Sequence, residues 1–169
     1  GTLAVKGPRV DLLAKGEYWQ ASAGRIELTT TISALDLALV EPFTAGQLKQ
    51  MKGDLRGDIR VTGEANRPQI LGGLYFSEAS FVPVFVGTQF LLKDEESAFT
   101  NDGVVLKDFD ISDQNSNKAS LNGSIRTKDY TTFALDLRLV ARNFQLLNTG
   151  EDDNELFYGK VSVNSNATI

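Results

Sequence analysis

The chain contains no cysteine and no histidine among its 169 residues. Without cysteine it can form neither a disulfide nor a thiolate nucleophile, and without histidine it lacks the commonest general base. The usual ligands of zinc are missing for the same reason. No apolar run reaches the roughly eighteen residues of a membrane-spanning helix. We therefore expect no enzyme, no metal site and no cofactor.

Positive charge is also scarce, since 17 Lys and Arg face 22 Asp and Glu and the net charge is −5. Nucleic-acid binding depends on a basic face that releases counterions from phosphates. The basic residues here form no stripe or cluster, so we expect no nucleic-acid partner.

Two groups of residues could be binding sites, but each has a simpler structural interpretation. The acidic run at 151–155 has neither the alternating spacing nor the glycine of a calcium loop, so a solvated turn is the better interpretation. Tyr18 and Trp19 could stack on a sugar, but aromatic residues in strands more often pack in a core or at its rim. No nucleophile motif frames any serine or lysine.

A segment of about forty residues recurs along the chain. Residues 34–40 read ALDLALV and residues 134–140 read ALDLRLV, which differ at one position only. GDIRVT follows the first copy from Gly57, and GKVSVN follows the second from Gly159. We infer a single fragment, 1–169, of a longer repetitive protein, with an internal repeat at approximately 21–63 and 119–165.

Apolar and polar residues alternate with a period of two along most of the chain, which predicts β-strands. One face of each strand is apolar and the other polar, as in an antiparallel sheet with one solvated side. About thirteen short strands are expected. The sequence therefore predicts an all-β protein with a long, mostly antiparallel sheet.

Glycine occupies the centre of four strands in the pattern apolar-x-Gly-x-apolar, at Gly57, Gly72, Gly123 and Gly159. Glycine inside a strand often marks a bend or bulge, and its repetition on one face would let the sheet curl. The alternative is that these glycines are only small fillers.

One short helix is expected near 45–51, because Thr44 and Gln47 form a capping box and Gly53 fits a terminator. Turn residues at 66–68, 101–103, 113–117 and 149–154 predict the connections between strands. Pro83 suggests an edge or bulged strand.

The apolar face itself has two possible roles. It could be a closed core, buried against a second sheet, or it could be an open groove for acyl chains, whose CH₂ groups each gain about 0.8 kcal/mol on leaving water. Both need the same alternation, so the pattern alone does not separate them.

Two long runs resemble a known family. TISALDLALVEPF followed by MKGDLRGDIRVTGEANRPQILGGLYFSEASF is similar to the C-terminal region of TamB-type proteins, in the AsmA-like group. The run from DGVVLKDFDISD to GKVSVNSN is similar to the TamB-like proteins of Bacteroidetes. The resemblance covers nearly the whole chain, more weakly before residue 21.

The resemblance implies a U-shaped, curved sheet (a β-taco) with an apolar concave lining. It implies a periplasmic segment of a protein that an inner-membrane helix anchors outside this chain. It also implies a partner of the TamA/BamA type and a role in outer-membrane assembly, autotransporter secretion and phospholipid transport. The groove-lining positions are the leucines of the two ALDLxLV segments and the apolar residues of the glycine-centred strands: Leu35, Leu37, Leu39, Leu55, Ile59, Val61, Leu121, Ile125, Phe133, Leu135, Leu137, Leu139 and Val161.

The predicted function is therefore a groove that shields lipid acyl chains, or outer-membrane protein clients, in transit between the two membranes. We expect phospholipids or such clients as partners, and an isolated fragment that dimerises through its apolar face. The alternative is a structural or adhesive β-repeat module with a closed core and no transport role, in which Leu37 and Leu137 would be buried against a second sheet.

Overall fold

The computed structural model describes residues 1–20, 24–127, 132–150 and 158–168. Nearly all of them lie in strands, and the only helical turns among them are two short 3₁₀ segments, η1 (Leu37–Leu39) and η2 (Glu41–Thr44). The ten strands are β1 (Thr2–Gly7), β2 (Val10–Trp19), β3 (Arg25–Asp36), β4 (Leu48–Glu64), β5 (Arg67–Pro83), β6 (Phe90–Thr100), β7 (Gly103–Asp113), β8 (Lys118–Thr127), β9 (Phe133–Thr149) and β10 (Gly159–Thr168).

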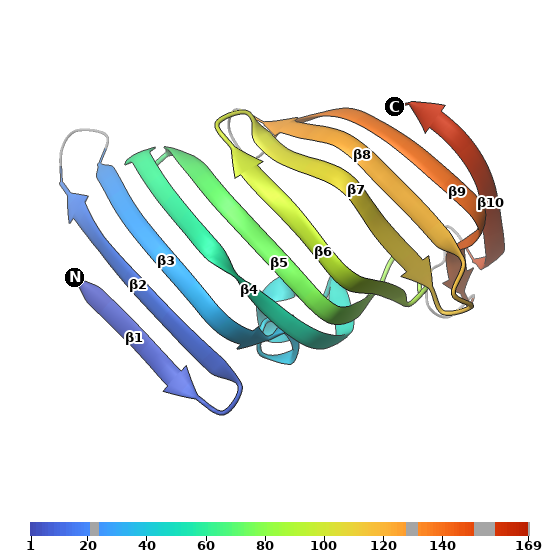
Figure 1. Cartoon of the computed structure of the whole chain (residues 1–169), viewed down its shortest axis with the longest axis horizontal. Coiled ribbons are helices and arrows are strands. Elements are labelled where there is room, and N and C mark those ends of the chain that lie inside the picture. The colour runs from blue at the N-terminus through green and yellow to red at the C-terminus, as the bar shows by residue number, and fades with distance from the viewer. Residues whose placement is uncertain (21–23, 128–131, 151–157, 169) are drawn as a thin grey trace.

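All ten strands form one sheet, in which their spatial order is their order along the chain. Each strand pairs antiparallel with the next, so the sheet is an open meander with β1 and β10 at its edges. Figure 1 shows this sheet curving from β1 at one side to β10 at the other, with the 3₁₀ segments behind β4 and β5. The prediction of an all-β, antiparallel, curved sheet is confirmed.

The predicted helix at 45–51 is wrong. Ala45 and Gly46 have positive φ and form a turn, and β4 begins at Leu48. Thr44 does act locally, because its hydroxyl donates to the Glu41 carbonyl, but no helix follows. Leu48 pairs instead with Pro83 of β5. A helix of two turns is marginal in water, so strand pairing overrides the capping pattern.

The ALDLALV segment also departs from the expected strand. β3 ends at Asp36, whose carboxylate accepts hydrogen bonds from the Arg9 side chain and from the Ala38 backbone N–H. The chain then turns through η1, so Leu37 and Leu39 do not continue a strand. The second copy, ALDLRLV, does continue as strand within β9. The count of about thirteen strands was too high, because β4, β5 and β9 are each 17 residues long.

Three of the predicted turns join strands as expected, at 65–66, 101–102 and 114–117. The fourth, at 149–154, lies mostly outside the described residues, as does the acidic run at 151–155. Pro83 is the last residue of β5, which pairs with strands on both sides and is not an edge strand.

The four predicted glycines all have φ between 120° and 149°, a range that other residues rarely adopt. Gly57, Gly72 and Gly123 lie inside strands, but Gly159 is the first residue of β10, so its predicted place at a strand centre is wrong. Gly57 and Gly72 lie on adjacent strands, and a Cβ at either would overlap a backbone carbonyl of the other strand, that of Gly73 and that of Asp58 respectively. The absence of a Cβ at these two positions therefore permits the backbones of β4 and β5 to approach closely. The alternative that these residues are only small fillers does not account for this close approach.

β-Bulges interrupt several of the strands. At two of them, a backbone N–H that has left the strand ladder donates to an asparagine of the following strand. Asp108 N–H donates to Asn122 Oδ1 at 2.7 Å, and Asn143 N–H donates to Asn164 Oδ1 at 2.8 Å. Bulges bend a strand and increase its twist, so they sharpen the curl of the sheet. The bulge residues with positive φ are Gln50 in β4, Glu78 in β5, Asp108 in β7 and Asn143 in β9.

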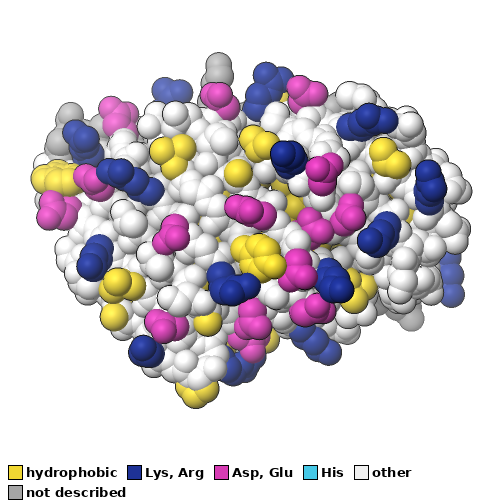
Figure 2. All heavy atoms as spheres, in the orientation of Figure 1, with side chains coloured by type: hydrophobic (Ala, Val, Ile, Leu, Met, Phe, Trp, Pro, Cys, Tyr) yellow, Lys and Arg dark blue, Asp and Glu magenta, His cyan; other side chains and the backbone are white. Residues whose placement is uncertain are grey.

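Polar and charged side chains occupy the face seen in Figure 2, where Lys and Arg are interspersed with Asp and Glu. Ion pairs and hydrogen bonds join polar side chains of adjacent strands on this face. Arg60 Nη2 of β4 lies 2.7 Å from Glu27 Oε1 of β3, and Tyr75 of β5 donates to Asp94 of β6. The apolar side chains lie on the opposite face of the same strands, which we call the concave face.

The sheet is open rather than closed into two layers. Its accessible surface is 10828 Å². A compact monomer of 18.4 kDa would expose about 8,200 Å². No second sheet covers the concave face among the described residues, so the closed core of the structural-module alternative is not formed in that way.

Candidate functional site

The concave face carries one continuous apolar cluster that spans β4 to β9 and includes η1. Its buried centre is formed by residues from six elements, so no single strand defines it. The 3₁₀ segment contributes Leu37, which packs over the face where β3 turns away. The buried members are Leu37, Met51, Leu55, Ala79, Leu92, Leu106, Phe109 and Leu137.

Six of the predicted lining residues belong to this cluster. Leu37, Leu55 and Leu137 are buried, and Leu35, Leu121 and Ile125 are half-buried against them. The burial of Leu37 and Leu137 comes from the curl of a single sheet and from η1, since no second sheet covers them in the described part of the chain.

The other predicted positions lie outside this cluster and are less buried. Ile59, Val61 and Leu139 are half-buried. Leu39, Leu135 and Val161 are exposed, and Leu135 leaves 49% of its surface open to solvent. The side chain of Phe133 is outside what the structure describes.

An apolar cavity of about 340 Å³ is hollowed into the concave face between β6 and β10. Ala119 of β8 and Ala141 of β9 face each other in register, and their small side chains leave the space. Phe90 and Phe144 stack with their ring centroids 5.5 Å apart at its wall. Its lining residues are Phe90, Ile111, Ala119, Leu121, Leu139, Ala141, Phe144, Leu146, Val163 and Ser165.

Sequence reasoning identified only Leu121 and Leu139 among these lining residues. Phe144 and Ile111 carried a signal, since one follows the second ALDLxLV segment and the other belongs to an alternating strand. Ala119 and Ala141 carried no such signal. Two small residues form a hollow only where they lie opposite each other, and the sequence alone does not show which residues of two strands are paired.

A buried polar cluster holds the end of the cavity where β9 leaves β8. Asp113 is 1% exposed, and its carboxylate accepts hydrogen bonds from the backbone N–H groups of Asn115, Asn117 and Gln145. Burial alone would raise the pKa of Asp113, but the hydrogen bonds from Asn117 and Gln145 outweigh it and hold the pKa below its usual range.

The same end of β9 is tied to the connection between β5 and β6. The Asn148 N–H donates to the Val86 carbonyl at 2.8 Å, although β5 and β9 are four strands apart in the sheet. Gly87 packs directly beneath the Asn148 carbonyl. These contacts fold the sheet over on itself along one edge of the cavity.

One carboxylate of β6 has a shifted pKa. Burial raises the pKa of Glu95 above its usual range, although the Asp110 backbone donates a hydrogen bond to it. The neighbouring Asp110 carboxylate adds to the rise, and Lys118 opposes it. No cluster of three or more potential metal ligands occurs among the described residues.

Tyr18 and Trp19 do not form a joint stacking platform. They are adjacent residues of β2, so their side chains point to opposite faces of the sheet. Trp19 lies under the guanidinium of Arg25 instead, with 6.0 Å between the guanidinium carbon and the ring centroid. Within the described ranges, no helix is long and apolar enough to cross a bilayer.

The fold and the site together define a class: a single open, curled, antiparallel sheet with a charged convex face and an apolar concave one. Residues 107–169 match the TamB C-terminal domain, a stretch that begins in β7 and includes β8, β9 and β10. This match supports a TamB-like protein, as the resemblance of its sequence indicated. No curated protein and no solved structure gives a significant match.

The domain match points to a broad role. TamB-type proteins serve in transport and assembly at the envelope of Gram-negative bacteria and are not enzymes as a family. They work in outer-membrane assembly and in general with partners of the TamA type. The domain match suggests a TamB-like role in outer-membrane assembly, and it implies a periplasmic portion of a Gram-negative envelope protein.

Proposed function

We propose that the concave face of this periplasmic segment shields the acyl chains of phospholipids in transit between the inner and outer membranes. The observation that carries the proposal is the 340 Å³ cavity, because among its described lining residues only Ser165 has a polar side chain. An acyl chain needs a continuous apolar surface and gains about 0.8 kcal/mol for each CH₂ buried.

Lipid fits the concave face better than an unfolded protein strand does. The backbone groups beneath the cavity are engaged in the ladders between β7 and β10. A client strand lying on this face would leave its own N–H and C=O groups without partners, at a cost of about 1–3 kcal/mol for each buried group. An acyl chain has no such groups. Client strands of outer-membrane proteins are therefore the second candidate.

The predicted lining residues divide by position within this proposal. Leu121 and Leu139 would contact a bound chain inside the cavity. Leu135 and Val161, which are exposed, would contact lipid that continues along the face. Anchoring in the inner membrane outside this chain, and an outer-membrane partner of the TamA/BamA type, complete the proposed arrangement.

Site-specific photo-crosslinking tests the proposal. A photoreactive residue replaces Leu139 in the cavity or Leu135 on the open part of the face, and Asp136 on the opposite face of β9 is the matched control. We expect phospholipid adducts at Leu139 and Leu135 but not at Asp136, as identified by mass spectrometry of the purified chain from envelope extracts.

Two other results decide against the proposal. Adducts with outer-membrane protein segments in place of lipid would assign the face to protein clients. Equal labelling at Asp136 and Leu139, or none at either, would leave a β-repeat module without a transport role.

A further inference from the structure

Residues 84–89, which connect β5 to β6, cross over to a strand that is not their neighbour in the sheet, and we call them the clasp. The Asn148 N–H of β9 donates to the Val86 carbonyl of the clasp at 2.8 Å. Gly87 lies so close to β9 that a Cβ on it would overlap the Asn148 carbonyl. Because β5 and β9 are four strands apart, these contacts join the two sides of the curled sheet at this end of the strands.

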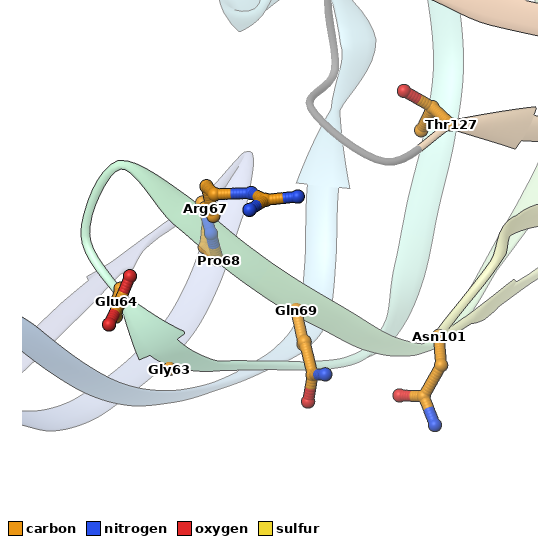
Figure 3. Close-up of a pocket in the computed structure, with 7 residues that line it drawn as sticks. All are labelled: Gly63, Glu64, Arg67, Pro68, Gln69, Asn101 and Thr127. Carbon is orange, nitrogen blue, oxygen red and sulfur yellow. The ribbon is translucent and has the colours of Figure 1, made fainter.

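The opposite ends of the same strands surround an open space. A polar pocket of about 440 Å³ lies there, between the β4–β5 turn, the β6–β7 turn and the end of β8. Figure 3 shows Arg67, Asn101 and Thr127 standing around this space, each on a different one of these three segments. The concave face is therefore open toward these turns and closed at the clasp.

The clasp and its partner strand both lead directly into the walls of the apolar cavity. Phe90, which lines the cavity, lies two residues after Thr88 of the clasp. Leu146, which also lines it, lies two residues before Asn148. The rings of Phe90 and Phe144 stack across the cavity wall with their centroids 5.5 Å apart. Movement of the clasp away from β9 would therefore separate two walls of the cavity.

The clasp has hydrogen bonds of its own that do not depend on β9. The N–H groups of Val86 and Gly87 both donate to the Pro83 carbonyl, at 3.2 Å and 2.9 Å. The Val84 N–H donates to the Gln47 carbonyl at 3.0 Å. These bonds keep the turn folded and attached beside β4, so the clasp can leave β9 as a unit.

Thr88 makes the closed position of the clasp less stable than its burial suggests. This residue is 0% exposed, and its hydroxyl has no hydrogen-bond partner in the described part of the chain. A buried hydroxyl without a partner loses its hydrogen bonds to water and gains none in return. Opening of the clasp would return this hydroxyl to water, which lowers the free energy that opening requires.

We propose that the clasp opens locally, while the strand ladders stay paired, and admits acyl chains to the cavity through the end that it closes. The inference rests on the proposed lipid function and adds the route of entry and its regulation. Opening breaks the contact between Val86 and Asn148, exposes Thr88 and moves Phe90 away from Phe144. Closure buries Val86 and Thr88 again and retains the acyl chain.

Thr88→Val tests the inference, because it keeps the shape of the side chain and removes the buried hydroxyl. Opening should become about tenfold rarer. Hydrogen exchange of the Asn148 amide, measured by NMR, should therefore slow about tenfold. Uptake of the fluorescent fatty acid cis-parinaric acid at saturating concentration, measured by stopped flow, should slow by the same factor. Thr29→Val, at an exposed threonine of β3, is the matched control and should change neither rate.

Gly87→Ala should have the opposite effect, and it tests the inference independently if Thr88→Val does not fold. Its Cβ would overlap the Asn148 carbonyl, so the closed clasp is destabilised and both rates should rise. Gly46→Ala is the matched control. Gly46 also has positive φ, but nothing lies within 4 Å of its Cβ position, so both rates should stay as they are.

The outcomes separate the clasp from the groove. If Thr88→Val slows exchange at Asn148 but not uptake, acyl chains enter from the open side, and the inference is overturned while the groove stands. If the Asn148 amide exchanges no faster than the amides of the β4–β5 ladder, the clasp opens only when the whole sheet unfolds, and the inference is again overturned. If neither the unchanged chain nor any variant takes up the fatty acid, the proposed function and the inference fail together.

Discussion

Gly57 and Gly72 allow the backbones of β4 and β5 to approach closely because neither residue has a Cβ atom. At either position, a Cβ would overlap a backbone carbonyl of the neighbouring strand. The sequence pattern predicted a bend or bulge at both residues and left open that they were only small fillers. It could not reveal the paired bulges and their asparagines, since these depend on which residue of the next strand lies opposite.

Gly57→Ala is predicted to destabilise the fold by about 3 kcal/mol or more, because it combines an unfavourable φ with backbone overlap. Gly46→Ala is the matched control. Gly46 also has positive φ, but nothing lies within 4 Å of its Cβ position, so it should cost only about 1 kcal/mol. Urea unfolding of the two variants measures the difference. Equal losses would show that φ alone, and not the close approach of β4 and β5, requires glycine at Gly57.

At the scale of elements, nearly identical segments take different structures. ALDLALV leaves the sheet at Asp36, where the Arg9 side chain and the Ala38 N–H share the carboxylate. The hydrogen bond from Arg9 is the main reason why the pKa of Asp36 lies below its usual range. Pro42 then supports η2. ALDLRLV stays in β9, and no side-chain partner of Asp136 is found among the described residues.

The sequence therefore predicted the elements well where local patterns decide, and less well where a distant residue decides. Period-two alternation and turn residues located the strands and three of the turns. Arg9 is far from Asp36 in the chain, and Pro83 is far from Leu48, so neither the end of β3 nor the start of β4 could be read locally. The cavity was missed for the same reason, because its wall depends on the register of β8 and β9.

The end of β9 should be held in place by the Asp113 carboxylate in a pH-dependent way. Its pKa is lower in the folded chain than in the unfolded chain, so its stabilising effect is complete above the unfolded value of about 3.9 and is lost as the pH falls through the folded value. Asp113→Asn should lower the free energy of unfolding by about 1–3 kcal/mol at pH 7.

The difference between Asp113→Asn and the unchanged chain should shrink as the pH falls below 4, as measured by urea unfolding across a pH series. Taking this difference cancels the opposing contributions of Asp36 and Glu95, which both proteins share. A difference that is constant with pH would show that the hydrogen bonds do not depend on the charge of Asp113.

On the scale of the whole molecule, the open concave face leaves apolar surface for self-association. We expect the isolated chain to form dimers through this face, with Leu135→Glu weakening the association about tenfold because a charge would be buried in the contact. Val5→Lys in the edge strand β1 is the control. Sedimentation velocity over a range of concentrations measures both. Dispersal by Val5→Lys alone would instead indicate pairing between exposed sheet edges.

The meander order of the strands has a consequence for how the sheet is built. Every one of the nine strand pairings joins neighbours along the chain, so loop closure between successive strands costs little entropy. A chain that enters the periplasm from one end could add each hairpin to the strand before it, in the order in which the strands arrive. The sheet could then form by zipping from β1 toward β10, without waiting for its last residue.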